Sequence, residues 1–505
     1  MKKITSILAF VLLIAGSFSA CSDWLDVRSD ELILEEDAFS TSKGYRTALM
    51  GIYKMAASPN LYGQELTWGL TSVMAYNYMA NQLPSKYKAI FDEGINSGSI
   101  KSTITNIWET AYTAIANCNN LIQNLEKTDL HFEYEWEKDM IMAEAKALRA
   151  LFHFEILRLF APAPAVAKDS SNVIPYVTNY PNIMPSYKST QEIIKNIVND
   201  LEIAREMLRP IDIDIMWKGT TLSNVSSMLF LGIQNLLDDG ERGNGRAIGF
   251  FCFRGYRMNY WGVTGLLARV HSYNRENDKA YVYANEIITD WIDAGKGFGF
   301  ATWQRPNNNP NMIDGKRYPE SLITFWNSKV AENYSAQAGT GSLYKMIQLT
   351  NLFGGDINED YRYTALVTDA TTRRYKVWND VDDAYETDEY INMVRVGCPV
   401  LEIPEMYYIK AEYLAEQGEF EQALATLKIV KNNRNITSAM PSVSDYESFM
   451  ELLLTDQIRD NLTRGNSFFY LKKLNWSKRY GLGGKWEAVP EGWYVLPIPE
   501  SESMF

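Results

Sequence analysis

The chain has 505 residues, with 49 lysines and arginines against 62 aspartates and glutamates, a formal net charge of −13 at pH 7. No basic tract interrupts this acidic balance, so nucleic acid and anionic lipid surfaces are poor partners for this chain. A chain of this length exceeds what one compact core usually supports, so it predicts either several domains or a core built repetitively from helix pairs. No Gly/Ser-rich or Pro-rich linker divides it, which favours a single domain over residues 21–505.

Residues 1–20 have the layout of a secretory signal peptide. Lys2 and Lys3 are followed by an apolar run over residues 7–15, which is too short to span a bilayer. Small residues then precede Cys21, and Phe18-Ser19-Ala20-Cys21 resembles a bacterial lipobox. Cleavage there would leave Cys21 as the first residue, with acyl chains that anchor the protein to a membrane. The alternative is an ordinary secreted protein with an incidental cysteine.

Residues 141–160 form the most regular helical stretch. Apolar residues recur at spacings of three and four, which places them on one face, with Leu148 and Phe152 as predicted core residues. Charged residues fill the other positions. We therefore expect His153 on that face to be solvated or salt-bridged. Pro162 should end the helix.

Three further stretches also predict helices. Residues 189–208 open with Ser189 and, three positions later, Glu192, a capping-box signature, and Pro210 should stop this helix. The other two stretches are helix pairs that resemble tetratricopeptide repeats without their strict period. They cover residues 265–274 with 278–292, and 404–417 with 419–434.

Two long segments, about 55–100 and 296–400, lack helical periodicity and are rich in Asn, Gly, Tyr and Trp. Only brief strand-like pieces occur between or within them, at 250–260 and 321–327. Binding function usually lies on long irregular segments carried by a rigid scaffold, so these two are the predicted location of a ligand site.

Signatures of catalysis and of metal binding are sparse. The three histidines lack metal-ligand spacing, and no zinc, Walker, dinucleotide or nucleophile-elbow motif occurs. A pair of carboxylates for glycoside hydrolysis remains open. One acidic cluster offers oxygen ligands for calcium but lacks the glycine and spacing of an EF-hand, so a solvated loop is favoured and no cofactor is predicted. The cluster is Asp380, Asp382, Asp383, Glu386 and Asp388.

Apart from Cys21, the chain has three cysteines, Cys118, Cys252 and Cys398. An odd number cannot pair fully, and the three lie far apart in sequence, so no disulfide framework is implied. We expect buried free thiols.

Several segments, in order along nearly the whole chain, carry a family resemblance. They open with CSDWLDV (21–27) and close with VLPIPESE (495–502). Between these lie AFSTSKGYRTALMGIY (38–53), IWETAYTAIANCNNLI (107–122), AEAKALRALFHFEILRLFAPAP (143–164), IVNDLEIAREML (197–208), RMNYWGVTGLLARVHSYN (257–274) and EIPEMYYIKAEYLAEQGEFEQALATLKIVKNNR (402–434). Together they resemble the SusD/RagB family of outer-membrane lipoproteins, which capture nutrients at the cell surface.

The resemblance implies a mainly α-helical, SusD-like fold with four tetratricopeptide-like helix pairs and a loop-rich side that carries the ligand site. It implies a non-catalytic lipoprotein, tethered to the outer membrane through acylated Cys21 and facing the cell exterior. Its ligand would be a glycan or oligosaccharide, and its partner a SusC-like TonB-dependent transporter. The alternatives are a peptide or another nutrient as ligand, a helical-barrel glycoside hydrolase, and a purely protein-binding helical-repeat scaffold.

The resemblance also indicates where a sugar would bind. A pyranose ring has one apolar face and a rim of hydroxyls, so it suits a flat aromatic ring beside planar hydrogen-bonding groups. The family places such residues on loops after its first helix and after its third helix pair. In this chain the corresponding ligand-binding candidates are Trp68, Tyr76, Asn77, Tyr78, Trp303, Gln304, Arg305, Trp326 and Asn327.

The anchor can be tested directly. We expect Cys21→Ala to move the protein from the outer-membrane fraction to a soluble fraction, because the thiol that takes up the acyl chains is lost. Cell fractionation with immunoblotting measures this. Unchanged membrane retention of the variant would contradict the lipoprotein interpretation.

Overall fold

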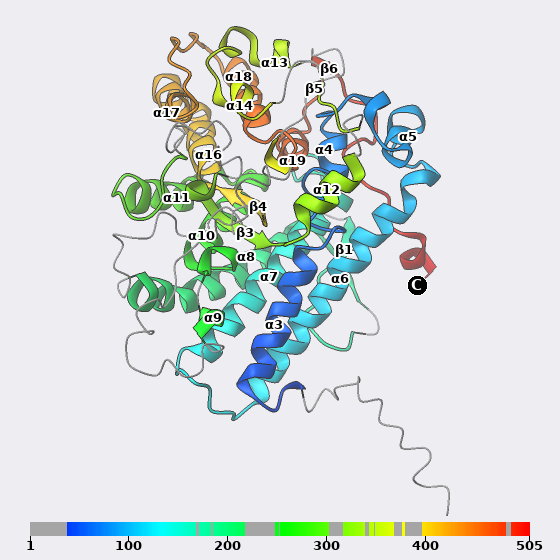
Figure 1. Ribbon diagram of the computed structural model, residues 1–505, viewed down its shortest axis with the longest axis vertical. Helices are drawn as coiled ribbons and strands as arrows, with labels where there is room; N and C mark the ends of the chain where they lie inside the picture. Colours follow the sequence, from blue (N-terminus) through cyan, green and yellow to red (C-terminus); the bar gives the residue numbers. More distant parts are fainter. Residues whose placement is uncertain are drawn as a thin grey trace, which may run out of the picture.

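The computed structural model describes residues 38–167, 171–182, 185–217, 248–251, 253–301, 317–338, 343–347, 349–367, 376–378, 396–480 and 486–504. Cys21, Cys252 and the acidic cluster at 380–388 lie outside the described residues. Helices dominate the structure, as predicted (Figure 1). Within the described ranges, no helix is both long and apolar enough to cross a membrane.

Besides the helices, the described residues form three small antiparallel sheets of two strands each. The helices are α3 (Ser42–Ala56), α4 (Leu70–Met74), α5 (Ser85–Glu93), α6 (Gly98–Lys127), α7 (Glu137–Phe160), α8 (Thr190–Arg209), α9 (Ile248–Phe251), α10 (Tyr260–Tyr273), α11 (Asn277–Glu286), α12 (Val330–Ala338), α13 (Thr350–Phe353), α14 (Tyr361–Thr364), α16 (Ile403–Glu416), α17 (Phe420–Asn432), α18 (Tyr446–Asp460) and α19 (Asn466–Lys473). The sheets pair β1 (Asn172–Pro175) with β2 (Tyr187–Ser189), β3 (Ser321–Trp326) with β4 (Gly397–Glu402), and β5 (Lys478–Tyr480) with β6 (Trp486–Ala488).

The long helices pack in pairs. Helix α3 packs on α6, α7 on α8, α10 on α11, and α16 on α17. Successive pairs touch through α6 with α7, α8 with α10, and α11 with α16. Figure 1 shows α3, α6, α7 and α8 lying side by side. Gly418, at φ +78°, permits the tight break between α16 and α17. These are the four helix pairs that the resemblance implied.

Helix α8 begins as predicted, and its α-helical turns end at Arg209, immediately before Pro210, as predicted. The capping box is present, because the Glu192 N–H donates to Ser189 Oγ at 3.3 Å and the Ser189 N–H donates to Glu192 Oε2 at 3.0 Å. The chain then continues through a π-helical segment, Pro210–Trp217. Pro210 has no backbone N–H to donate an α-helical hydrogen bond. Its φ of −62° is still helical, so the chain continues as a π-helix.

Helix α7 is buried on nearly all sides. Leu148 and Phe152 are fully buried, which confirms them as core residues. Few side chains of α7 reach solvent, because α3, α6 and α8 all pack on it. Its charged residues bind these neighbours instead. Arg149, for example, donates to both carboxylate oxygens of Asp200 on α8, at 2.8 and 2.7 Å.

The expectation that His153 is solvated or salt-bridged is wrong. The side chain is fully buried, and its Nδ1–H donates to the Arg149 carbonyl while Nε2 accepts from the Val177 N–H, each at 2.9 Å. Its ring stacks on Tyr176 with centroids 3.9 Å apart. Burial lowers the pKa of His153 to about 3, so this histidine is a neutral part of the core.

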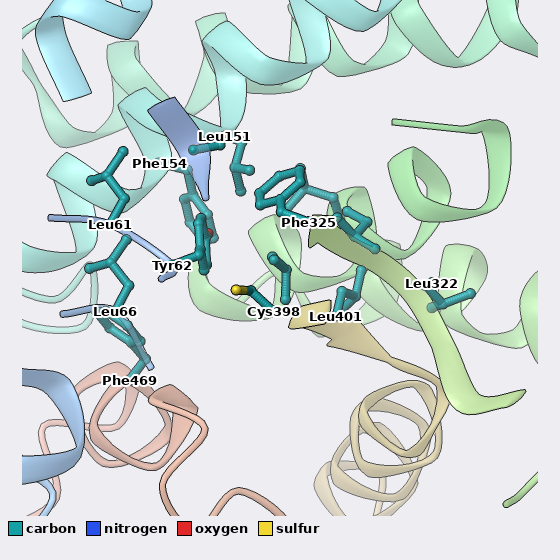
Figure 2. Packing of buried hydrophobic residues seen from close by; sticks show 14 of the residues in the cluster. Leu61, Tyr62, Leu66, Leu151, Phe154, Leu322, Phe325, Cys398, Leu401 and Phe469 are labelled. Carbon is teal, nitrogen blue, oxygen red and sulfur yellow. The ribbon is translucent and has the colours of Figure 1, made fainter. Parts of the chain in front are cut away.

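One hydrophobic cluster extends from Tyr45 to Leu496. Figure 2 shows its packing where Leu151 and Phe154 of α7 lie near Phe325 of β3 and Cys398 of β4. Cys118 and Cys398 are buried free thiols, as predicted. Burial raises the pKa of the Cys118 thiol well above its ordinary range.

The division of the chain into a signal peptide and a single domain stays a prediction.

The two strand predictions have opposite outcomes. Residues 321–326 form β3, as predicted, whereas the described residues of 250–260 contain the end of α9 and a 3₁₀ turn at Arg254–Tyr256. Phe253 has φ +59°, which a continuous strand does not allow. The irregular segment 55–100 is also more helical than expected, since it contains α4 and α5.

Candidate functional site

An open cleft of about 900 Å³ lies beside the end of β3. Its walls come from three parts of the chain: the end of α3, the segment from α9 through the following 3₁₀ turn, and the connection from β3 to α12. Clefts of this size commonly hold small-molecule ligands. The described lining includes Met50, Lys54, Phe253, Tyr256, Trp326 and Lys329.

Trp326 is the aromatic ring most open to a ligand in this cleft. The β3 side chains from Ser321 to Phe325 are buried, and Trp326, the last residue, is 46% exposed. Tyr256 packs edge-on against its ring, with centroids 5.3 Å apart and planes at 73°. Met50 and Phe253 are also partly exposed and add apolar surface. An indole supported in this way can stack on the apolar face of a ligand ring.

Asn327 holds the connection after β3 against the end of α3. Its Nδ2 donates to the Ala57 carbonyl at 2.7 Å, and its Oδ1 accepts from the Lys329 N–H at 2.8 Å. Its own backbone N–H donates to the Val396 carbonyl at 2.7 Å. The sequence predicts Asn327 as a ligand contact; in the structure its amide binds the protein, which fixes the position of Trp326.

A buried carboxylate on α7, Glu144, lies behind the cleft lining. Arg257 donates from Nε to Oε2 at 2.9 Å and from Nη2 to Oε1 at 2.8 Å, and Arg254 also donates to Oε1. The Tyr53 hydroxyl donates to Oε2 at 2.5 Å. Burial, followed by the charge of Glu144, raises the pKa of Tyr53 well above its usual value. Tyr53 therefore stays a neutral donor.

The same network explains why the segment before α10 is not a strand. Arg254 donates to both oxygens of Asp212, at 2.8 and 3.1 Å, and Asp212 accepts from the Tyr260 N–H at 2.8 Å. Arg254 and Arg257 are both buried, and each binds Glu144. A strand would point residues three apart to opposite faces, so two arginines that share one carboxylate require the turn.

Four predicted ligand contacts, Trp68, Tyr76, Asn77 and Tyr78, lie in the core instead. Trp68 is fully buried, and its indole N–H donates to a backbone carbonyl at 3.1 Å. Tyr78 donates to the Trp68 carbonyl at 2.9 Å, and Asn77 Oδ1 accepts from the Thr463 N–H at 3.0 Å. The four side chains are at most 5% exposed. They join segments distant in sequence and offer no ring face to a ligand in this structure.

Trp303, Gln304 and Arg305 lie outside the described residues. Of the nine predicted contacts, the structure brings Trp326 and Asn327 to the cleft.

Sequence reasoning missed Met50 and Tyr256. Met50 follows Leu49, a buried residue of α3. An apolar residue beside the buried face of a helix is a signal in the sequence for exposed apolar surface. Tyr256 carries no such signal, because the sequence pattern of its segment predicts a strand.

No cluster of three or more His, Cys, Asp or Glu side chains suited to a metal ion occurs in the described part of the chain. The acidic residues considered for calcium lie outside it, so their role stays a prediction.

The Glu144 network predicts a large stability effect. We expect Glu144→Gln to lower the free energy of unfolding by about 3–5 kcal/mol, because two buried arginines lose a charged partner. Urea denaturation followed by circular dichroism measures this. Glu133→Gln is the matched control: Glu133 is 44% exposed and pairs with Arg46, so its loss should cost no more than about 1 kcal/mol. Equal, small effects of both substitutions would contradict a structural role for Glu144.

Part of the chain is similar to known proteins in sequence. Residues 23–216 match the model of a SusD-like family described as starch-binding and associating with the outer membrane. A SusD-like protein from Formosa agariphila is 27% identical over 208 residues, which cover 40% of this chain. The match spans 38% of the length of that relative.

Solved structures share the fold over most of the chain. A SusD superfamily protein from Bacteroides thetaiotaomicron has a TM-score of 0.66 at 18% identity, covering 92% of this chain and 98% of that one. A SusD-like carbohydrate binding protein from Bacteroides vulgatus has a TM-score of 0.63 at 16% identity, covering 92% and 96%. These similarities confirm both the resemblance and the helical fold predicted from sequence.

Proposed function

We propose that the chain is a member of the SusD-like family and a non-catalytic oligosaccharide-binding protein of the cell surface. The family description and the name of the Bacteroides vulgatus relative both refer to carbohydrate binding. The observation that carries the proposal for this chain is the half-exposed indole of Trp326 in an open cleft.

The cleft combines the two kinds of surface that a sugar ring needs. The apolar C–H face of a pyranose stacks on the Trp326 indole, while amide and hydroxyl groups pair with the sugar hydroxyls. Asn333 and Ser328 supply such groups on the lining. Trp303, Gln304 and Arg305 are proposed as further contacts, from the sequence prediction alone.

Binding without cleavage is part of the proposal. Most glycoside hydrolases flank the scissile bond with two carboxylates. The described lining of the cleft contains neither Asp nor Glu. A peptide or another nutrient in the same cleft is the alternative that ligand screening would reveal.

Trp326→Ala tests the site. We expect it to weaken oligosaccharide binding by at least about tenfold, since stacking on one aromatic ring contributes roughly 1–1.5 kcal/mol or more once its buried area is included. Titration calorimetry on the folded variant measures the affinity, and a reducing-end assay checks for cleavage. Tyr180→Ala, which removes a 40% exposed aromatic ring outside the cleft, is the control. Unchanged affinity in folded Trp326→Ala would remove this cleft as the binding site.

The proposal extends to location and partner. The protein is anchored in the outer membrane through acylated Cys21, faces the cell exterior, and passes its ligand to a SusC-like TonB-dependent transporter. The outer-membrane association in the family description supports the location. The transporter follows from the family resemblance.

Co-purification tests the partnership. We expect pull-down of the native lipoprotein from detergent-solubilised outer membranes to recover a large TonB-dependent barrel protein, identified by mass spectrometry. The Cys21→Ala variant, expected in the soluble fraction, is the control for proteins that are recovered only because they share a membrane with the lipoprotein. Isolation of the lipoprotein alone, under conditions that preserve other such pairs, would argue against the partnership.

A further inference from the structure

The charged side chains on the described lining of the cleft are all cations. Lys54 comes from α3, Arg257 from the turn after α9, and Lys329 from the connection to α12. The chain as a whole is acidic, with a formal net charge of −13. A locally positive surface on an acidic protein is complementary to an anionic ligand.

The protein neutralises these three cations to different degrees. Arg257 is buried and donates to both oxygens of Glu144, so its charge is already paired. Lys329 Nζ lies 2.6 Å from Glu332 Oε2, but both side chains are 66% exposed, and an ion pair so exposed to water is weak. Lys54 is exposed and forms no ion pair with any described residue. Lys54 is therefore the cation most available to a ligand.

Lys54 also has a role that needs no ligand. It lies in the last turn of α3, where a cation stabilises the negative end of the helix dipole. That role affects the stability of the protein but gives no preference among ligands. Lys54 and Trp326 line the same cleft, so one ligand can contact both the ammonium and the indole.

We infer that the oligosaccharide bound in this cleft is acidic, with carboxylate or sulfate groups on its rings. Trp326 stacks on a ring face, and Lys54 donates charge-assisted hydrogen bonds to an anionic substituent. The inference rests on the proposed function and narrows its substrate class. It makes Lys54 a specificity-determining residue.

The test compares acidic oligosaccharides with neutral counterparts of the same backbone. The probes are oligogalacturonate and its carboxyl-reduced form, and a sulfated galactan oligosaccharide and its desulfated form. We expect at least one acidic probe to bind the mature protein on the order of tenfold more tightly than its neutral form, because a hydrogen bond to a charged group is stronger than one between neutral groups. The two pairs of probes distinguish carboxylate from sulfate recognition.

Two matched substitutions on α3 assign the preference to Lys54. Lys54→Met should remove most of it, while Lys43→Met, at an exposed position in the first turn of α3 and outside the cleft, should leave it unchanged. Raising the ionic strength should weaken binding of the acidic form more than binding of the neutral form.

Equal affinity for acidic and neutral forms would overturn the inference, and so would a full preference retained by folded Lys54→Met. These results are distinguishable from failure of the proposed function. Equal binding of acidic and neutral probes that is lost in Trp326→Ala would overturn only the acidic preference. Acidic binding that is unaffected in folded Trp326→Ala would overturn the proposed site, and with it the inference.

Discussion

The cleft depends on the buried carboxylate of Glu144. It lies on α7, the helix enclosed by α3, α6 and α8, and it accepts hydrogen bonds from Arg254, Arg257 and Tyr53. Those donors belong to two walls of the cleft, α3 and the segment after α9. Removing a charge from water costs on the order of several kcal/mol per ion, so neither wall can leave the carboxylate without a large penalty. Two of the three walls of the cleft are held in place because they share one buried charge.

The strand that carries Trp326 is held at its other end by the same kind of interaction. Arg317 donates to Asp460 at 2.8 Å and to Glu402 at 2.7 Å, and Glu402 pairs in register with Ser321, the first residue of β3. Burial alone would raise the pKa of Asp460, but the neighbouring arginines, led by Arg317, outweigh it and hold that pKa below its usual range. The stabilisation is therefore present at neutral pH and is lost only in acid, below the ordinary aspartate pKa.

Local signals in the sequence predicted the helices but not their surroundings. The apolar stripe through Phe152 and the capping box at Ser189 depend on residues a few positions apart, and both are confirmed. The charged residues of α7 fit a solvated face and a set of internal ion pairs equally well. Their partners lie far along the chain: Asp200 is 51 residues from Arg149, and Arg254 is 110 residues from Glu144. Periodicity contains no information about such pairings, so it predicted neither the buried environment of His153 nor the turn at Arg254–Tyr256.

The aromatic candidates show why only part of the site was predictable. Trp68 and Trp326 were chosen for the same chemistry, yet one ring is enclosed and the other is 46% exposed. What separates them is position: Trp326 ends a strand whose preceding five side chains are buried, where Asn327 ties the chain to α3. Tyr256 already supports the Trp326 ring, so a ligand would order little that is not ordered beforehand, and binding loses less conformational entropy. The end of β3, more than the residue type, makes this tryptophan suitable for stacking.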